Sequence, residues 1–248
     1  MLSLRELYGE SEMNIAVINF SGNVGKTTVV RHLLAPRLPE SEVIAIESIN
    51  ADETAGLSAE RMRGQQFGEL QERLLSGGAV IVDIGASNVE DFMALMGEFD
   101  GSHEDFDQFV VPTVPAGKQQ RDTVATISEL QAYGVPASRI RVIFNMVDRV
   151  EHADMERVFE PIFACHEAHR SFTLSRTAVI HRSEIYSRAA AFGMSIDAIL
   201  SDPTDYKAEI GQTANQAEKA RLARLVSIRR LAGGVSAELD AVFKAITA

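Results

Sequence analysis

The sequence predicts an α/β fold in which a mostly parallel sheet is covered by helices on both faces. Short apolar runs alternate along the chain with longer segments that have helical periodicity. Polar clusters follow three of these runs, at 21–28, 83–87 and 145–148. Parallel sheets bind ligands at the carboxyl ends of their strands. We therefore expect the three clusters to form one site from distant segments.

The expected strands are short, apolar and bounded by turn residues. The first, Asn-Ile-Ala-Val-Ile-Asn-Phe at 14–20, is typical of a buried parallel strand. The third, at 79–84, is preceded by Gly77 and Gly78 and followed by Gly85. The full set of predicted strands is 14–20, 43–46, 79–84, 109–113 and 141–145, with a short sixth at 172–174.

The expected helices fill the segments between these strands. Residues 56–76 carry apolar residues at helical spacing, as do 27–38 and 118–133. From about residue 183 to the end, the pattern is dominated by helices. This alternation is typical of a sheet with crossover helices.

The chain length is sufficient for one sizeable α/β domain, because 248 residues bury a well-filled core. We expect an N-terminal extension at 1–12, a main domain at 13–200, and C-terminal helices at 201–248 that belong to the same domain. The single Cys165 forms no internal disulfide, and no apolar run approaches the length of a membrane span. The N-terminus lacks a signal-peptide pattern, so we expect a cytoplasmic location.

The most specific motif lies between the first expected strand and the first expected helix. It reads Gly22-Asn23-Val24-Gly25-Lys26-Thr27-Thr28. Glycines let backbone N–H groups approach an anion, and the N-terminus of the next helix adds a favourable dipole. Lys26 is placed to reach the β- and γ-phosphates of a nucleotide, and Thr27 Oγ to bind Mg²⁺. We interpret the segment as the phosphate loop of a P-loop NTPase.

The loop resembles the deviant Walker A loop of the ParA/MinD ATPases, whose form is K-G-G-x-G-K-T-T. The matching residues are Gly22, Gly25, Lys26, Thr27 and Thr28, and Val24 fills the free position. Ser21 stands at the family's signature lysine, and Asn23 at its second glycine. The resemblance covers about residues 13–200. It implies ATP and Mg²⁺ as cofactors and a nucleotide-dependent homodimer.

The loss of the signature lysine bears on the rate of hydrolysis. In ParA-like dimers this lysine crosses the interface and neutralises charge on the partner's nucleotide. Such charge stabilisation accelerates phosphoryl transfer by several powers of ten. With Ser21 at this position, we expect a weak ATPase, or another source of the missing cation.

Asp83 closes the third expected strand in the segment Val-Ile-Val-Asp-Ile-Gly. The segment resembles a Walker B strand, in which an acid holds Mg²⁺ directly or through water. We therefore predict Asp83 and Thr27 as the metal-binding residues. The alternative is an acid that only ends the strand.

The segment Asn145-Met146-Val-Asp148 follows the fifth expected strand. In ParA-like proteins the Asn of N-x-V-D contacts the adenine, so the resemblance places Asn145 at the base, and we predict Asp148 as a further nucleotide-binding residue. GTPases use N-K-x-D instead, and Met146 replaces that lysine, which favours ATP over GTP. A loop that only caps a helix is the remaining alternative.

Acidic residues also follow the second expected strand, where the family has D-x-D. Glu47 matches the first acid in charge, whereas Ile49 stands at the second. Asp52 lies three residues further on and is our candidate for positioning the attacking water, with Asn50 and Glu53 as alternatives. The predicted catalytic residues are Lys26, Asp52 and Glu47.

Within the family, the segment from Ile46 to Asp52 and the phosphate loop look most like the plasmid-encoded StbB and TraL group. That likeness implies a role in plasmid stability, partition or positioning, or in conjugative transfer. It also implies a plasmid-encoded DNA-binding partner protein.

A basic stretch at 219–230 stands out from the acidic chain, whose formal net charge is −11. Its apolar residues are interleaved with arginines, which predicts an amphipathic helix. Three alternatives remain: a helix packed on the domain with a solvated basic face, a contact with DNA, or a contact with membrane as in MinD. The last two imply association with the nucleoid or the membrane.

Two other functions compete with a switch ATPase. One is a non-hydrolysing nucleotide-binding adaptor that docks a protein partner, which Ser21 and Ile49 favour. The other is a small-molecule kinase or ligase on the P-loop scaffold. The sequence shows no second set of paired acids and arginines that would hold an acceptor substrate.

Overall fold

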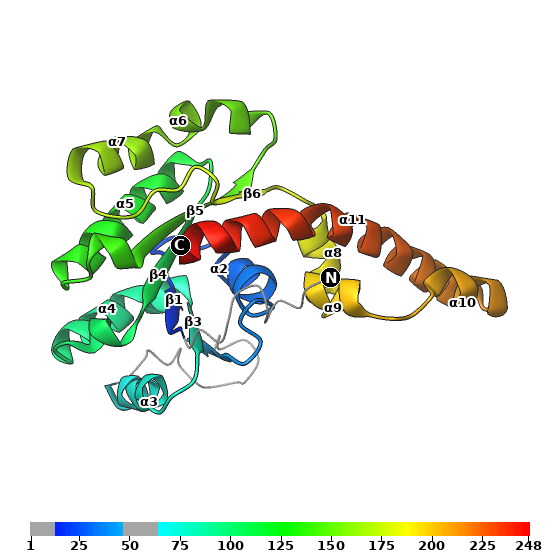
Figure 1. The fold of residues 1–248 in the computed structure, drawn as a ribbon, viewed down its shortest axis with the longest axis horizontal. Coiled ribbons are helices and arrows are strands. Elements are labelled where there is room, and N and C mark those ends of the chain that lie inside the picture. The colour runs from blue at the N-terminus through cyan, green and yellow to red at the C-terminus, as the bar shows by residue number, and fades with distance from the viewer. Residues whose placement is uncertain (1–12, 47–63) are drawn as a thin grey trace, which may run out of the picture.

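In a computed structural model, which describes residues 13–46 and 64–248, six strands form one sheet. Each strand pairs with its neighbours in parallel, in the order β2-β3-β1-β4-β5-β6 (Figure 1). The predicted parallel α/β architecture is therefore confirmed. The strands are β1 (Ile15–Val17), β2 (Glu42–Ile46), β3 (Val80–Ile84), β4 (Gln108–Thr113), β5 (Ile140–Val147) and β6 (Val179–His181).

Helices cover both faces of this sheet. On one face lie α3 (Gly64–Leu75), α4 (Val89–Glu98), α5 (Gly117–Ala132), α6 (Met155–Val158) and α7 (Glu160–His169). On the other face lie α2 (Lys26–Val29) with the π-helical turn Val30–Leu34 that continues it, α8 (Ile185–Ala191), α9 (Ile196–Ser201) and the second half of α11 (Gln216–Thr247). The short α10 (Tyr206–Gln212) packs against the first half of α11.

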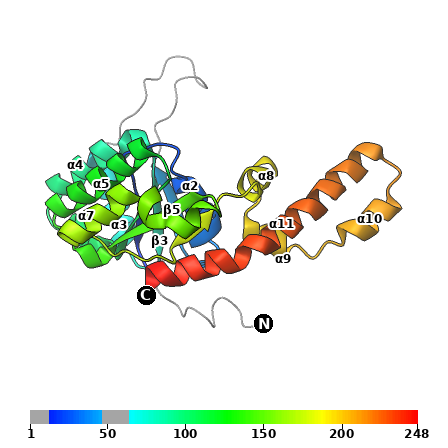
Figure 2. The same cartoon turned by 90° about the horizontal axis from the view of Figure 1, so that it is seen from above.

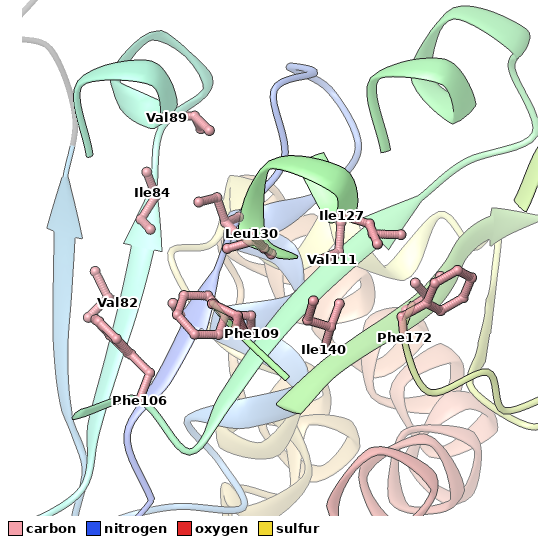
Figure 3. Close-up of a cluster of buried hydrophobic side chains, with 14 of the residues drawn as sticks. Val82, Ile84, Val89, Phe106, Phe109, Val111, Ile127, Leu130, Ile140 and Phe172 are labelled. Carbon is pink, nitrogen blue, oxygen red and sulfur yellow. The ribbon is translucent and has the colours of Figure 1, made fainter. Parts of the chain in front are cut away.

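The core is divided by the sheet because strand side chains alternate between its faces. In β3, Val80, Val82 and Ile84 point to one side and Ile81 to the other. Figure 3 shows the first of these two clusters, in which Val82 and Phe109 from neighbouring parts of the sheet lie beneath helix side chains. Because both faces of the sheet are covered, the strand sequences are nearly continuous hydrophobic runs.

The sixth strand lies elsewhere than the sequence predicted. Residues 172–174 make only an isolated bridge between Thr173 and Arg141, and the sixth strand is Val179–His181. Phe172 is buried in the core, so its apolar character reflects packing and not strand pairing. The segments of α4, α6 and α7 were not predicted. The helix expected at 27–38 is shorter, since α2 and its π-helical turn end at Leu34.

An arm made of α10 and the first half of α11 projects from the body (Figures 1 and 2). Its own small cluster consists of Tyr206, Leu222 and Leu225, while the second half of α11 packs on the sheet from Ile228 to Ile246. None of the helices in the described part combines the length and apolar character that crossing a bilayer requires.

Candidate functional site

The segment between β1 and α2 has the geometry of an anion-binding loop. Gly25 adopts a left-handed conformation with φ of 84° and precedes Lys26, the first residue of α2. Asn23 is also left-handed, with φ of 59°. No side chain caps the first turn of α2. The backbone N–H groups of that turn have no acceptor within the helix, so the loop presents them to a ligand.

Lys26 is held inside this loop. Its Nζ donates to the carbonyl oxygens of Asn19 at 3.0 Å and Ser21 at 2.9 Å. Burial lowers the pKa of Lys26, and the nearby carboxylate of Asp83 opposes that shift. The ammonium is thus buried beside one carboxylate and held by two neutral carbonyls, and an anionic ligand would be a stronger partner.

Asp83 lies next to the start of the loop. In the parallel pairing of β1 with β3, it is opposite Val17, the last residue of β1. Asp83 is buried, whereas Thr27 in the first turn of α2 is exposed. A hydroxyl and a carboxylate are hard oxygen donors, and Mg²⁺ commonly uses one or two such groups together with phosphate oxygens and water. Thr27 and Asp83 therefore fit a magnesium ion.

A cluster of at least three His, Cys, Asp or Glu side chains suited to a metal does not occur in the described ranges. A site made from one threonine, one aspartate and nucleotide oxygens requires no such cluster.

Asn145 ties the loop to the end of β5. Its Nδ2 donates to the carbonyl oxygen of Val24 at 2.8 Å, and its Oδ1 accepts from the backbone N–H of Met146 at 2.9 Å. A Cβ added at Gly25 would lie 2.3 Å from Asn145 Nδ2. The sequence predicted Asn145 at the base of the nucleotide. The structure shows that its amide supports the phosphate loop, and the contact with the base stays a prediction.

Asp148 begins the turn that follows β5. Its carbonyl oxygen accepts from the backbone N–H of Glu151 at 2.9 Å, and its side-chain Oδ1 accepts from Arg182 Nε at 3.2 Å. Both ends of this ion pair are exposed. Arg182 follows β6, so the pair connects the segments after two neighbouring strands. Asp148 thus lies at the same edge of the sheet as the loop.

Helix α5 supplies contacts to the loop that the sequence did not reveal. Asn19 Nδ2 donates to Thr123 Oγ1 at 2.8 Å, and the backbone N–H of Phe20 donates to Thr126 Oγ1 at 3.1 Å. Ser21 Oγ donates to Asp122 Oδ2. The signal was the presence of polar residues on the apolar face of a helix, since Thr123 and Thr126 are fully buried.

The structure brings the phosphate loop, Asp83 and the Asn145 segment together at the carboxyl edge of the sheet, as the strand order requires. Glu47 and Asp52 lie outside the described residues. Their catalytic roles stay predictions.

Comparisons with known proteins agree with this geometry at the level of the fold. No protein-family model matches the chain, and no curated protein sequence matches it significantly. Among solved structures, the MinD cell division protein of Aquifex aeolicus is 15% identical, with a TM-score of 0.52 over 89% of this chain and 97% of that one. The chain has the fold of the ParA/MinD P-loop NTPases.

Two further structures have the ParA/MinD fold and are similarly distant in sequence. Apo McdA of Cyanothece is 15% identical, with a TM-score of 0.51 over 95% of this chain and 98% of that one. The MinC:MinD cell division protein complex of Aquifex aeolicus gives 15% identity and a TM-score of 0.51 over 89% of this chain and 96% of that one. The likeness to all three extends over nearly the whole chain.

The basic stretch 219–230 lies outside the nucleotide region of this ParA/MinD fold, on the arm. Arg229 is not free for a ligand there, because its guanidinium donates to three carbonyl oxygens and lies 4.3 Å from the Tyr206 ring centroid. Arg221 pairs with Glu218 at 2.8 Å. Arg224 and Arg230 are exposed. The stretch thus has one structural arginine and a solvated basic face.

Proposed function

We propose that the protein binds Mg–ATP at the loop 22–28 and acts as a slowly hydrolysing switch ATPase of the ParA/MinD type. The observation that carries this proposal is the uncapped first turn of α2, where Lys26 lies buried beside Asp83 at the carboxyl edge of the sheet. That arrangement offers a triphosphate backbone donors, an ammonium group and an acid for its metal ion.

Each residue of the site has a defined task in this proposal. The ammonium of Lys26 leaves the carbonyls of Asn19 and Ser21 and contacts the β- and γ-phosphates. Thr27 Oγ and Asp83 would hold Mg²⁺, which would supply positive charge beside the phosphates. Asn145 contacts the base at the far end of the nucleotide, and Asp148 is a further nucleotide-binding residue beside it. Glu47 and Asp52 orient the attacking water.

The biological setting follows from the resemblance of the sequence. We place the protein in plasmid stability, partition or positioning, or in conjugative transfer, with a plasmid-encoded DNA-binding protein as its partner. The fold likeness to MinD in a MinC:MinD complex supports a partner protein that binds this scaffold. The solvated basic face of 219–230 supports additional contact with DNA or membrane.

Nucleotide binding can be tested with Lys26→Ala. We expect wild-type protein with Mg²⁺ to bind ATP more tightly than GTP in isothermal titration calorimetry, and Lys26→Ala to lose at least a hundredfold in affinity, about 3 kcal/mol. The matched control is Lys207→Ala, which removes an exposed lysine from α10. Equal ATP binding by wild type and Lys26→Ala, with both folded by circular dichroism, would reject the loop assignment.

A second candidate is a nucleotide-binding adaptor that does not hydrolyse ATP. The observation that favours it is the bond between Ser21 and Asp122, because the loop position of the signature lysine bears no charge and faces its own α5. Light scattering with and without Mg–ATP separates the two functions. A doubling of mass with measurable turnover supports the switch ATPase, and a constant mass with tight ATP binding and no turnover supports the adaptor.

A further inference from the structure

The first turn of α5 carries an ammonium group to the edge of the phosphate loop. Lys118 Nζ donates to Asp122 Oδ2 at 2.9 Å, and the same carboxylate oxygen accepts from Ser21 Oγ. One oxygen atom therefore connects Lys118 with the loop residue at the signature-lysine position. The loop residue is buried, whereas the Lys118 side chain is 73% exposed.

The charge of Asp122 determines the electrostatic potential at this edge of the loop. The hydrogen bonds from Ser21 and then from Lys118 hold the pKa of Asp122 below its usual range, so the carboxyl group is ionised at neutral pH. An ionised carboxylate bonded to Ser21, the residue before Gly22, would repel a triphosphate. A cation at the same place offsets that repulsion, and Lys118 is the cation that contacts Asp122.

The ion pair between Lys118 and Asp122 is weak enough to exchange. The Lys118 side chain is 73% exposed and that of Asp122 27%, so water screens the lysine end of the pair, and holding the long lysine in one geometry costs entropy. A triphosphate has more charge than one carboxylate, and the flexible four-carbon stem of lysine lets its ammonium move between neighbouring anions. Ser21 stays bonded to Asp122 and satisfies that oxygen when the lysine leaves.

We propose that Lys118 supplies the cation that the loop lacks at Ser21, by transferring its ammonium from Asp122 to the terminal phosphate of the nucleotide bound at the same loop. This inference rests on the proposed function, and it adds a phosphate-binding residue from α5 to the site. Asp122 holds the ammonium near the loop until the γ-phosphate arrives. The charge lost from the loop is thereby replaced from the neighbouring helix.

The test compares ATP with ADP, because only ATP has the terminal phosphate. With Mg²⁺, Lys118→Met should weaken ATP binding about tenfold while ADP affinity stays within twofold, since a hydrogen bond to a charged group is worth about that much. The matched control, Arg121→Met, removes an exposed arginine of the same helix whose charge acts on Asp122 less than the hydrogen bond from Lys118 does. It should leave the ratio of ATP to ADP affinity unchanged.

Moving the cation back to the loop provides a second test. In the double variant Ser21→Lys with Lys118→Met, a lysine contacts Asp122 from the loop side, and we expect the ATP preference to return. An unchanged ratio of ATP to ADP affinity in Lys118→Met would overturn the inference, and so would an equal loss for both nucleotides. If Lys26→Ala still abolishes binding in that case, the proposed function stands and only the role of Lys118 fails.

Discussion

At Gly25, both the backbone conformation of the loop and the packing against β5 require a residue without a Cβ atom. Its φ of 84° lies in the left-handed region, where a Cβ costs about 1–2 kcal/mol. A Cβ there would also lie 2.3 Å from Asn145 Nδ2 and 3.2 Å from Met146 Cε. Packing against the end of β5 therefore requires a glycine at this position, and the proposed phosphate binding favours one as well.

Gly25→Ala should lower both stability and ATP affinity. The left-handed strain and the displacement of Asn145 predict a loss of at least about 2 kcal/mol in the free energy of unfolding. Chemical denaturation and calorimetry measure the two effects. The control is Gly22→Ala, whose added Cβ meets only Ala86 Cβ at 3.9 Å. If both alanine variants were equally stable, the close approach of Gly25 to Asn145 would not contribute to the free energy of unfolding.

For individual residues, the sequence indicated the chemistry of the local motifs but not the hydrogen-bond partners that lie far away in the chain. The left-handed turn at Gly25 and the placement of Lys26 and Asp83 at one edge of the sheet agree with the local motif spacing. Their roles in phosphate and metal binding stay predictions. The supporting role of Asn145 was not predictable, because its acceptor on Val24 is 121 residues away. The bond from Ser21 to Asp122 spans 101 residues and left no local signature.

Among the elements, the buried strands were predicted better than the helices on the acidic surface. The short apolar runs in β3 and β4, rich in β-branched residues, are typical of strands in a sheet covered on both faces. The run at Phe172 had a second explanation, a single aromatic residue packed under a loop, and this is what the structure shows. Helix α4 was missed although its buried residues Val89, Phe92, Met93 and Met96 have helical spacing.

Arg229 and a small apolar cluster hold the arm together. The guanidinium donates to the carbonyl oxygens of Ile199 at 3.2 Å, Thr204 at 2.8 Å and Asp202 at 2.7 Å. The first and third of these residues lie at the end of α9 and its C-cap, where carbonyl groups lack helical partners. Arg229 thereby fastens the segment between α9 and α10 to α11.

Arg229→Met should loosen the arm while the sheet remains folded. Losing charged hydrogen bonds to otherwise unpaired carbonyls predicts a cost of about 2 kcal/mol. Hydrogen exchange should show faster exchange in residues 199–212 and unchanged exchange in β1 and β4. Arg230→Met is the control, because Arg230 is the next residue in the helix and its side chain is exposed. Identical exchange in the two variants would show that the three carbonyl bonds do not stabilise the arm.

For the whole molecule, the two core clusters are joined through one sheet, but the face that carries α2, α9 and α11 also contains buried polar groups. His32, in the π-helical turn, is buried and accepts a hydrogen bond at Nδ1 from the backbone N–H of Ile196 at 3.2 Å. Tyr186 lies 5.6 Å away between ring centroids, and Arg37 Nη1 donates to the His32 carbonyl oxygen. The bond from Ile196 to His32 links α9 to the helical segment that follows the phosphate loop.

His32 predicts how the stability of the whole molecule depends on pH. Burial, followed by the charge of Arg31, lowers the pKa of His32 to about 4 from 6.5. Between these two values the unfolded chain binds a proton that the folded chain does not. The free energy of unfolding should therefore be level in this respect above pH 6.5 and fall by on the order of 3 kcal/mol as the pH drops to 4.

His32→Asn keeps an acceptor near the position of Nδ1 and removes the titrating ring. Urea denaturation of wild type and variant between pH 7 and pH 4 measures the slope. The variant starts less stable because it loses ring packing against Tyr186, but its stability should fall less steeply than that of the wild type. His169→Asn, at an exposed position in α7, should follow the wild-type curve. Parallel curves for wild type and His32→Asn would show that protonation of other groups, and not of this buried ring, unfolds the domain in acid.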